Sequence, residues 1–249
     1  MKTITDIFYT DARHSRQSLD LYLPDCEQFP VFIYFHGGGI VSGDKKQRFL
    51  RFLQEKGVAV IGANYRLYPE AVYPEFICDA ASVVAWAYKH MPEYGTVTGC
   101  FVGGSSAGGY LTQMLCFDKK YLEMHNIDSD SISGYVMDAG QPTAHFNVLK
   151  ERGIDGRRVI IDESAPIYHI TAGRKYAPMQ IIVAENDMRN RFEQTQLMIS
   201  TLKHMGCEED KIDYRFMMGC KHVEYVDQFR EDGSSVFADL IHDFIMKKI

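Results

Sequence analysis

The stretch Gly103-Gly104-Ser105-Ser106-Ala107-Gly108-Gly109 decides how this chain is expected to fold. It contains the pattern G-x-S-x-G, in which a serine occupies a strained turn between a strand and a helix. Glycine is needed two residues to either side, because a side chain there would collide with neighbouring backbone. The pattern favours Ser106 as an exposed nucleophile. A second register, Gly103-x-Ser105-x-Ala107, would present Ser105 instead, but it lacks the second glycine.

The flanking residues supply the strand and the helix that such a turn requires. Upstream, an apolar run over residues 97–102 leads into the glycines and is typical of a buried strand. Downstream, apolar side chains recur at helical spacing, which indicates one buried helix face: Ala107, Tyr110, Leu111, Met114 and Leu115. Strand, turn and helix therefore follow in the order that the motif needs.

Strand-like and helical patterns alternate along the rest of the chain. Further strand-like runs cover residues 3–9, 18–23, 31–35, 58–63, 132–137, 179–184 and 213–217. Helical patterns cover residues 49–53 (ending at Gly57), the stretch after Pro74, residues 190–205 and the stretch from Ser234. This alternation predicts an α/β fold with a mostly parallel sheet and helices on both faces. The first two strands have no room for a helix between them and are expected to pair antiparallel.

The 249 residues suit a single α/β domain spanning residues 1–249. Residues 140–176 fit the alternation poorly, apart from a helical stretch near residues 145–152. An insertion between two core strands is a natural place for a small cap over a site.

Charge and composition exclude several classes of function. Lys and Arg number 27 against 33 Asp and Glu, for a net charge of −6, and the charges are scattered rather than gathered in blocks. This pattern argues against a nucleic acid or an anionic membrane as partner. No apolar run reaches the length of a signal peptide or a membrane span, so a soluble, cytoplasmic protein is expected. The six cysteines lack metal-ligand spacing, which favours buried free thiols, no metal and no cofactor.

A second glycine cluster, His36-Gly37-Gly38-Gly39, directly follows the predicted strand 31–35. Backbone N–H groups of such a loop can stabilise the negative oxygen that forms during acyl transfer. A loop of this type supplies one donor, and the residue after the nucleophile supplies another. The predicted oxyanion hole therefore consists of the amides of Gly38, Gly39 and Ala107.

Together, three motifs resemble those of the α/β-hydrolases, most of all the hormone-sensitive-lipase-like family of bacterial esterases. They are the loop at residues 36–39, the heptapeptide Asn64-Tyr65-Arg66-Leu67-Tyr68-Pro69-Glu70, which is similar to the family's YRLAPE signature, and residues 103–109. The resemblance covers nearly the whole chain and implies eight strands, of which the second is antiparallel. The chain departs from the family at Ser105, where an acidic residue is usual, and at Ile40, where an aromatic one is common. Both departures concern the shape of the pocket.

A serine nucleophile needs a general base and a carboxylate that orients the base. In this fold their order along the chain is serine, acid, histidine. His222 follows the last predicted strand and is the expected base, whereas His36 is expected to brace the glycine loop. Asp187, just after the strand 179–184, is the expected acid, with Glu185 and Asp138 as rivals.

These residues predict a serine esterase that acts through an acyl-enzyme on small-molecule esters. The modest insertion at 140–176 has little apolar material for a long acyl tail, which favours short groups such as acetyl. The resemblance to the esterase family implies acetylated carbohydrates as candidate substrates. Two alternatives stay open at this point: an amidase such as an arylformamidase with the same triad, and a non-catalytic binding protein on this fold. The sequence does not select an oligomeric state.

Overall fold

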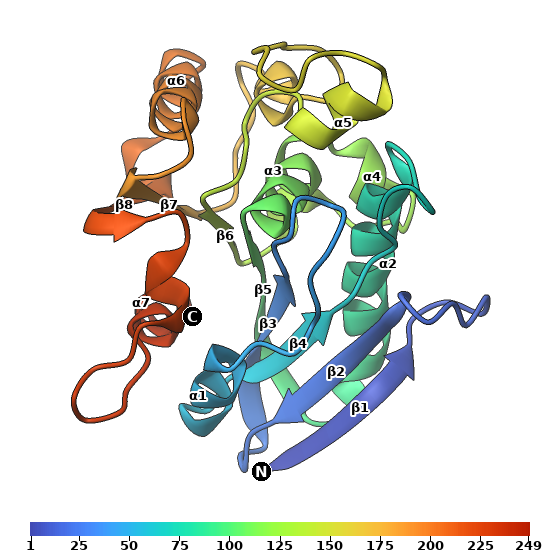
Figure 1. Ribbon diagram of the computed structural model, residues 1–249. Coiled ribbons are helices and arrows are strands. Elements are labelled where there is room, and N and C mark those ends of the chain that lie inside the picture. The colour runs from blue at the N-terminus through green and yellow to red at the C-terminus, as the bar shows by residue number, and fades with distance from the viewer.

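A computed structural model describes residues 1–249 and contains one eight-stranded sheet (Figure 1). The strand order across the sheet is β1-β2-β4-β3-β5-β6-β7-β8. The strands are β1 (Lys2–Phe8), β2 (Ser18–Leu23), β3 (Gln28–Phe35), β4 (Ala59–Ala63), β5 (Thr96–Ser105), β6 (Gly134–Asp138), β7 (Met179–Asn186) and β8 (Ile212–Lys221).

Strand β2 is the one that runs against the rest of the sheet. It pairs antiparallel with both β1 and β4, while every pair from β4 to β8 is parallel. The predicted eight-stranded α/β-hydrolase sheet, with an antiparallel second strand, is thereby confirmed. All eight predicted runs are strands, although β8 continues four residues beyond the predicted end at residue 217.

Helices cover both faces of the sheet (Figure 1). On one face, α1 (Phe49–Glu55) and α7 (Val236–Met246) enclose a core cluster of 19 buried residues. On the other, α2 (Glu75–His90), α3 (Ala107–Phe117) and α6 (Arg191–His204) share a cluster of 49. Each helix lies where its apolar periodicity predicted, because those residues bury against the sheet. The one-turn helix α4 (Lys120–Glu123) is too short for periodicity to reveal.

The segment 140–176 contains one short α-helix, α5 (Phe146–Glu151), and a 3₁₀ turn at Pro166–His169. The segment is tied to the main body through α3, since the Tyr110 hydroxyl donates to the carbonyl oxygen of Ser164 at 2.8 Å. In Figure 1, α5 lies at the top, above α3 and α4. Its predicted role as a cap stays a prediction.

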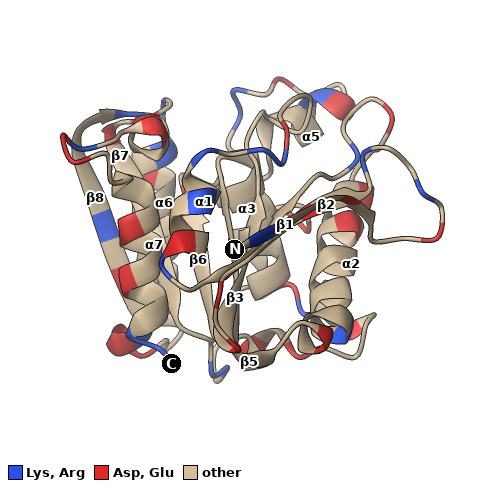
Figure 2. Ribbon diagram, turned by 90° about the horizontal axis from the view of Figure 1, so that it is seen from below, with Lys and Arg blue, Asp and Glu red and all other residues tan.

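Charged residues of both signs are interspersed over the helices and loops seen in Figure 2. No helix is both long enough and apolar enough to cross a membrane. All six cysteines are free thiols. Burial is as predicted for Cys116 and Cys207, whereas Cys78, Cys100 and Cys220 are half-buried. Cys26 is exposed, because it lies in the turn between β2 and β3 rather than on an apolar face.

The turn between β5 and α3 is the tightest part of the fold. A Cβ atom on Gly104 would lie 2.7 Å from the carbonyl oxygen of Phe35 and 2.5 Å from the carbonyl of Gly108. A Cβ atom on Gly108 would overlap the Phe35 carbonyl oxygen outright. The glycines of the motif thus let the first turn of α3 rest directly on the end of β3.

We predict that Gly108→Ala destabilises the protein by about 3 kcal/mol or more, because backbone atoms cannot move aside as a flexible side chain could. Gly57→Ala is the matched control. Gly57 has a positive φ of 87° but nothing within 4 Å of a new Cβ, so only the conformational cost of about 1 to 2 kcal/mol applies. Urea denaturation measures both. Equal losses in the two variants would show that the close approach of α3 to β3 is not required.

Candidate active site

The predicted site residues come from loops at the carboxyl ends of neighbouring parallel strands. Ser106 follows β5, Asp187 follows β7, His222 follows β8, and the glycine loop follows β3. These ends meet at one edge of the sheet, where ligand sites of open α/β sheets lie. Ser106 has φ 56° and ψ −111°, a conformation that non-glycine residues rarely adopt. The strain turns its hydroxyl out of the strand and away from the helix.

The structure brings Ser106, His222 and Asp187 into one hydrogen-bonded row. The Ser106 Oγ lies 2.8 Å from His222 Nε2, and His222 Nδ1 lies 2.5 Å from Asp187 Oδ1. With Nδ1 protonated and donating to the carboxylate, Nε2 has a free lone pair that can take the serine proton. This arrangement suits a nucleophile, a base and an orienting acid.

Asp187 is held in its ionised form. Its side chain is 1% exposed, and it also accepts from the backbone N–H of Met188 at 2.7 Å. Burial raises the pKa of this carboxyl, but the hydrogen bond and charge of His222, with the Met188 amide, outweigh burial and hold the pKa below its ordinary value of 3.8. A carboxylate fixed in this way sets the tautomer and the orientation of the histidine.

The rival residues are turned elsewhere. Ser105 is buried, and its hydroxyl bonds to Tyr34 and Asp138 instead of His222. Glu185 accepts the backbone N–H of Gly219 at 2.7 Å. Asp138 accepts from Ser105 at 2.5 Å and from Tyr225, but its carboxyl makes no hydrogen bond to His222. Only Asp187 is bonded to the imidazole.

The amides of all three glycines in the loop donate no hydrogen bond within the chain, including those of the predicted donors Gly38 and Gly39. Both residues have positive φ, 106° and 64°. The Gly37 carbonyl oxygen is bonded to His36 Nδ1 at 2.6 Å, and the Gly38 carbonyl oxygen accepts from the N–H groups of Val41 and Ser42. In a planar trans peptide the N–H points opposite to the carbonyl, so these bonds aim the next amides, of Gly38 and Gly39, the other way.

His36 braces this loop as a neutral side chain. Burial lowers the pKa of His36 from 6.5 to about 4. Its Nδ1 can therefore donate to Gly37, while Nε2 accepts from the Arg16 guanidinium at 3.0 Å and the ring stacks on Tyr65. Ala107, the third predicted donor, opens α3, where first-turn amides lack helical partners. The oxyanion role of the three amides stays a prediction.

A cavity of about 620 Å³ opens in front of Ser106. Its lining includes the glycine loop and four residues that sequence reasoning missed: Phe146, Asn147, Lys150 and Met188. Asn147 donates its side-chain amide to the Gly39 carbonyl oxygen, so α5 holds the glycine loop from outside. No motif marks these residues, because the sequence pattern shows that α5 forms but not what it packs against.

A buried network lies directly beneath the nucleophile. The Tyr34 hydroxyl donates to Ser105 at 2.9 Å, and Ser105 and Tyr225 both donate to Asp138. Burial raises the pKa of Asp138 from 3.8 to about 7, although both donated hydrogen bonds act to lower it. Tyr225 follows the base, His222, by three positions. The network therefore anchors the loop that carries His222 to the strand that carries Ser106.

A family model matches the part of the chain that carries the glycine loop and Ser106. The model described as BD-FAE matches residues 19–148, slightly more than half of the chain, including the glycine loop and Ser106. The chain belongs to the BD-FAE family. The identification as an α/β-hydrolase is thus confirmed. Asp187 and His222 lie beyond the matched BD-FAE segment, and their catalytic roles stay predictions.

Individual relatives of this BD-FAE chain carry esterase or converting-enzyme names. The chain is 26% identical over 200 residues to tuliposide A-converting enzyme 2 of Tulipa gesneriana. That alignment covers 68% of this chain and 52% of the tulip enzyme. The chain is 38% identical over 96 residues to esterase LipI of Mycobacterium tuberculosis, covering 37% and 30% of the two chains. The chain thus spans about half or less of these curated relatives.

Among solved structures, esterase B of Lactobacillus rhamnosis superposes on this BD-FAE chain with a TM-score of 0.79. The superposition covers 99% of this chain and 86% of the other, at 18% identity. At this level of identity the likeness shows that the fold is shared.

We predict that Tyr225→Phe costs about 1 to 3 kcal/mol of stability, and more at about pH 9 than at about pH 5. The folded chain keeps the Asp138 proton up to about pH 7, whereas an unfolded carboxyl loses it near 3.8. Stability from this group therefore falls as pH rises between these values. The hydrogen bond from Tyr225 stabilises the ionised form of Asp138, which dominates above about pH 7. Loss of this bond therefore lowers the free energy of unfolding most above that pH.

Tyr135→Phe is the matched control, because the buried Tyr135 hydroxyl donates to the carbonyl oxygen of Ser129, which does not titrate. Urea denaturation at both pH values measures the difference. If the loss of stability in Tyr225→Phe were the same at both pH values, as is expected for Tyr135→Phe, then Asp138 would not titrate between them.

Proposed function

We propose that this protein is a carboxylesterase, which hydrolyses esters of small acyl groups through a covalent serine intermediate. The observation that carries the proposal is the row Ser106–His222–Asp187, with distances of 2.8 and 2.5 Å, facing an open cavity. The esterase names of its relatives support the same chemistry. A binding protein on this fold would not need a strained serine bonded to an oriented histidine.

In the proposed reaction, His222 Nε2 takes the proton of Ser106 as its Oγ attacks the ester carbonyl carbon. The negative oxygen is held by the amides of Gly38, Gly39 and Ala107, each contributing on the order of 3 kcal/mol to lowering the barrier. The carbon–oxygen bond to the alcohol then breaks, and His222 returns the proton to the leaving oxygen. Water attacks the acyl-enzyme in turn, giving its proton to His222, and the acid leaves as Ser106 regains a proton.

The lining of the cavity favours a small acyl group and a polar alcohol. Of its six apolar lining residues, Val41 and Met188 are 49% and 42% exposed, and these two form an open rim around the cavity. A long acyl tail would stay largely in water and would gain little of the roughly 0.8 kcal/mol that each buried methylene can contribute. Polar residues along the cavity, including Gln47 and Asn147, suit an acetylated carbohydrate.

Ser106→Ala is expected to abolish turnover of 4-nitrophenyl acetate and labelling by a fluorophosphonate probe, because no other hydroxyl is bonded to His222. Ser105→Ala provides the control. It removes the neighbouring hydroxyl, which is bonded to Tyr34 and Asp138, and should still be labelled. Activity in Ser106→Ala, or loss of labelling only in Ser105→Ala, would refute the assignment.

A series of 4-nitrophenyl esters from acetyl to decanoyl tests the acyl preference. We expect kcat/KM to be highest for acetyl or propionyl and to fall with chain length, because the open rim cannot desolvate added methylenes. The rate of each ester in buffer alone corrects for its intrinsic reactivity. A maximum at the long end would contradict the proposed preference for small acyl groups.

A further inference from the structure

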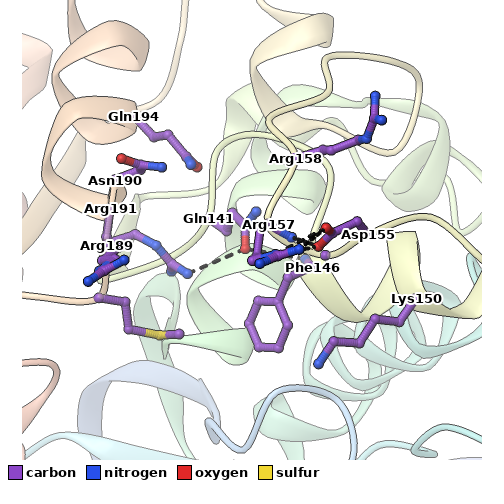
Figure 3. A pocket seen from close by; sticks show the side chains of 12 residues that line it. Gln141, Phe146, Lys150, Asp155, Arg157, Arg158, Arg189, Asn190, Arg191 and Gln194 are labelled. Atoms are coloured by element: carbon purple, nitrogen blue, oxygen red, sulfur yellow. Dashed lines mark hydrogen bonds and ion pairs between the residues drawn. The ribbon is translucent and has the colours of Figure 1, made fainter.

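A second cavity, of about 650 Å³, adjoins the one in front of Ser106. Phe146, Lys150 and Met188 line both, so the two cavities share a wall formed by α5 and the residue after Asp187. The rest of its lining comes from Gln141 and from two segments far apart in sequence, the loop at 155–158 after α5 and the stretch 189–194 at the start of α6 (Figure 3).

This second cavity is strongly cationic. Five basic residues line it against a single carboxylate, that of Asp155: Lys150, Arg157, Arg158, Arg189 and Arg191. Asp155 is already paired with Arg157 at 2.6 Å. Lys150, Arg158 and Arg189 make no ion pair with any carboxylate. The concentration of positive charge stands out on a chain whose net charge is −6.

Arg191 is the least expected member of the group. It is 3% exposed, and the partners of its guanidinium are neutral: the carbonyl oxygen of Ala139, and Gln141 Oε1 at 3.4 Å. No carboxylate lies within ion-pair distance of it. Burial lowers the pKa of Arg191 to about 10, with the Asp187 charge acting against that shift, so the side chain remains charged at neutral pH. The charge of Asp187 offsets part of the cost of burying this guanidinium, and an anion bound in the cavity would offset more of it.

We propose that this cavity binds an anionic oxygen group, a carboxylate or a phosphate, on the alcohol part of the ester. The proposal rests on the proposed function and specifies its substrate. With a small acyl group at Ser106, the bulk of the substrate is its alcohol, and the shared wall places the cationic cavity next to it. Guanidinium groups present paired donors that match the two oxygens of a carboxylate or phosphate. An acidic acetylated sugar has this chemistry.

The test compares kcat/KM for acetate release from three esters: acetylated glucose, acetylated glucuronate and acetylated glucose 6-phosphate. At low salt we expect at least one anionic ester to be preferred over the neutral one on the order of tenfold. Added salt should reduce that preference. The two anionic arms distinguish a carboxylate from a phosphate, and equal kcat/KM values for all three would overturn the proposal.

Variants of Arg189 locate the effect. Arg189 is exposed and free of ion pairs, so Arg189→Gln should fold normally while lowering the anionic-to-neutral ratio severalfold, and Arg189→Lys should retain part of it. Arg51→Gln, at an exposed position on α1 with no ion pair, makes the same change in net charge far from the cavity and should leave the ratio unchanged. If Arg51→Gln lowered the anionic-to-neutral ratio equally, the preference would depend only on the net charge of the protein, and the proposed site would be overturned.

The proposed function can fail separately. If 4-nitrophenyl acetate is hydrolysed but anionic esters are not preferred over the neutral one, the esterase function is supported and the anion site is overturned. If no ester is hydrolysed, calorimetry of glucuronate and of inorganic phosphate with the wild-type protein still tests the site. Binding that weakens severalfold in Arg189→Gln supports the site, and the absence of binding by both anions overturns it.

Discussion

The contact between the first turn of α3 and the end of β3 is the constraint on which the rest of the site depends. Gly104 and Gly108 permit this contact because neither has a side chain to hold the backbones apart. It forces Ser106 into a conformation with positive φ, and it places the glycine loop after β3 beside the serine. A single steric requirement therefore brings the nucleophile and the loop amides into one cavity.

Much of the fold could be predicted because local patterns report it directly. The central parallel strands β3, β4 and β6 and most of β7 are buried and appear as largely continuous apolar runs, and the helices show one apolar side. The order of the loops along the chain, together with the resemblance to the family, predicts that Ser106, Asp187 and His222 lie close together, since every parallel strand of the sheet ends at the same edge. Chain order and strand direction together imply proximity without any knowledge of contacts.

The rest of the site could not be predicted, because it depends on packing between segments that no local pattern connects. Asp138 is a rival acid by its position in the sequence, but its burial and its bond to Tyr225 follow only from how the loop after His222 folds back on β6. Asn147 reaches the glycine loop across 108 positions of sequence. The basic residues of the second cavity come from α5, from the loop at 155–158 and from the start of α6, which the sequence alone does not connect.

The amides of Gly38 and Gly39 owe their direction to partners on the opposite side of their peptide planes. His36 fixes one plane, and Arg16 in turn holds His36 while also donating to the carbonyl oxygens of Gly43 and Tyr65. Arg16 lies in the loop before β2, at the antiparallel margin of the sheet, and lines none of the cavity. The N-terminal hairpin of this fold is thus more than an edge that completes the sheet. It acts as a mechanical support for donors that it never touches.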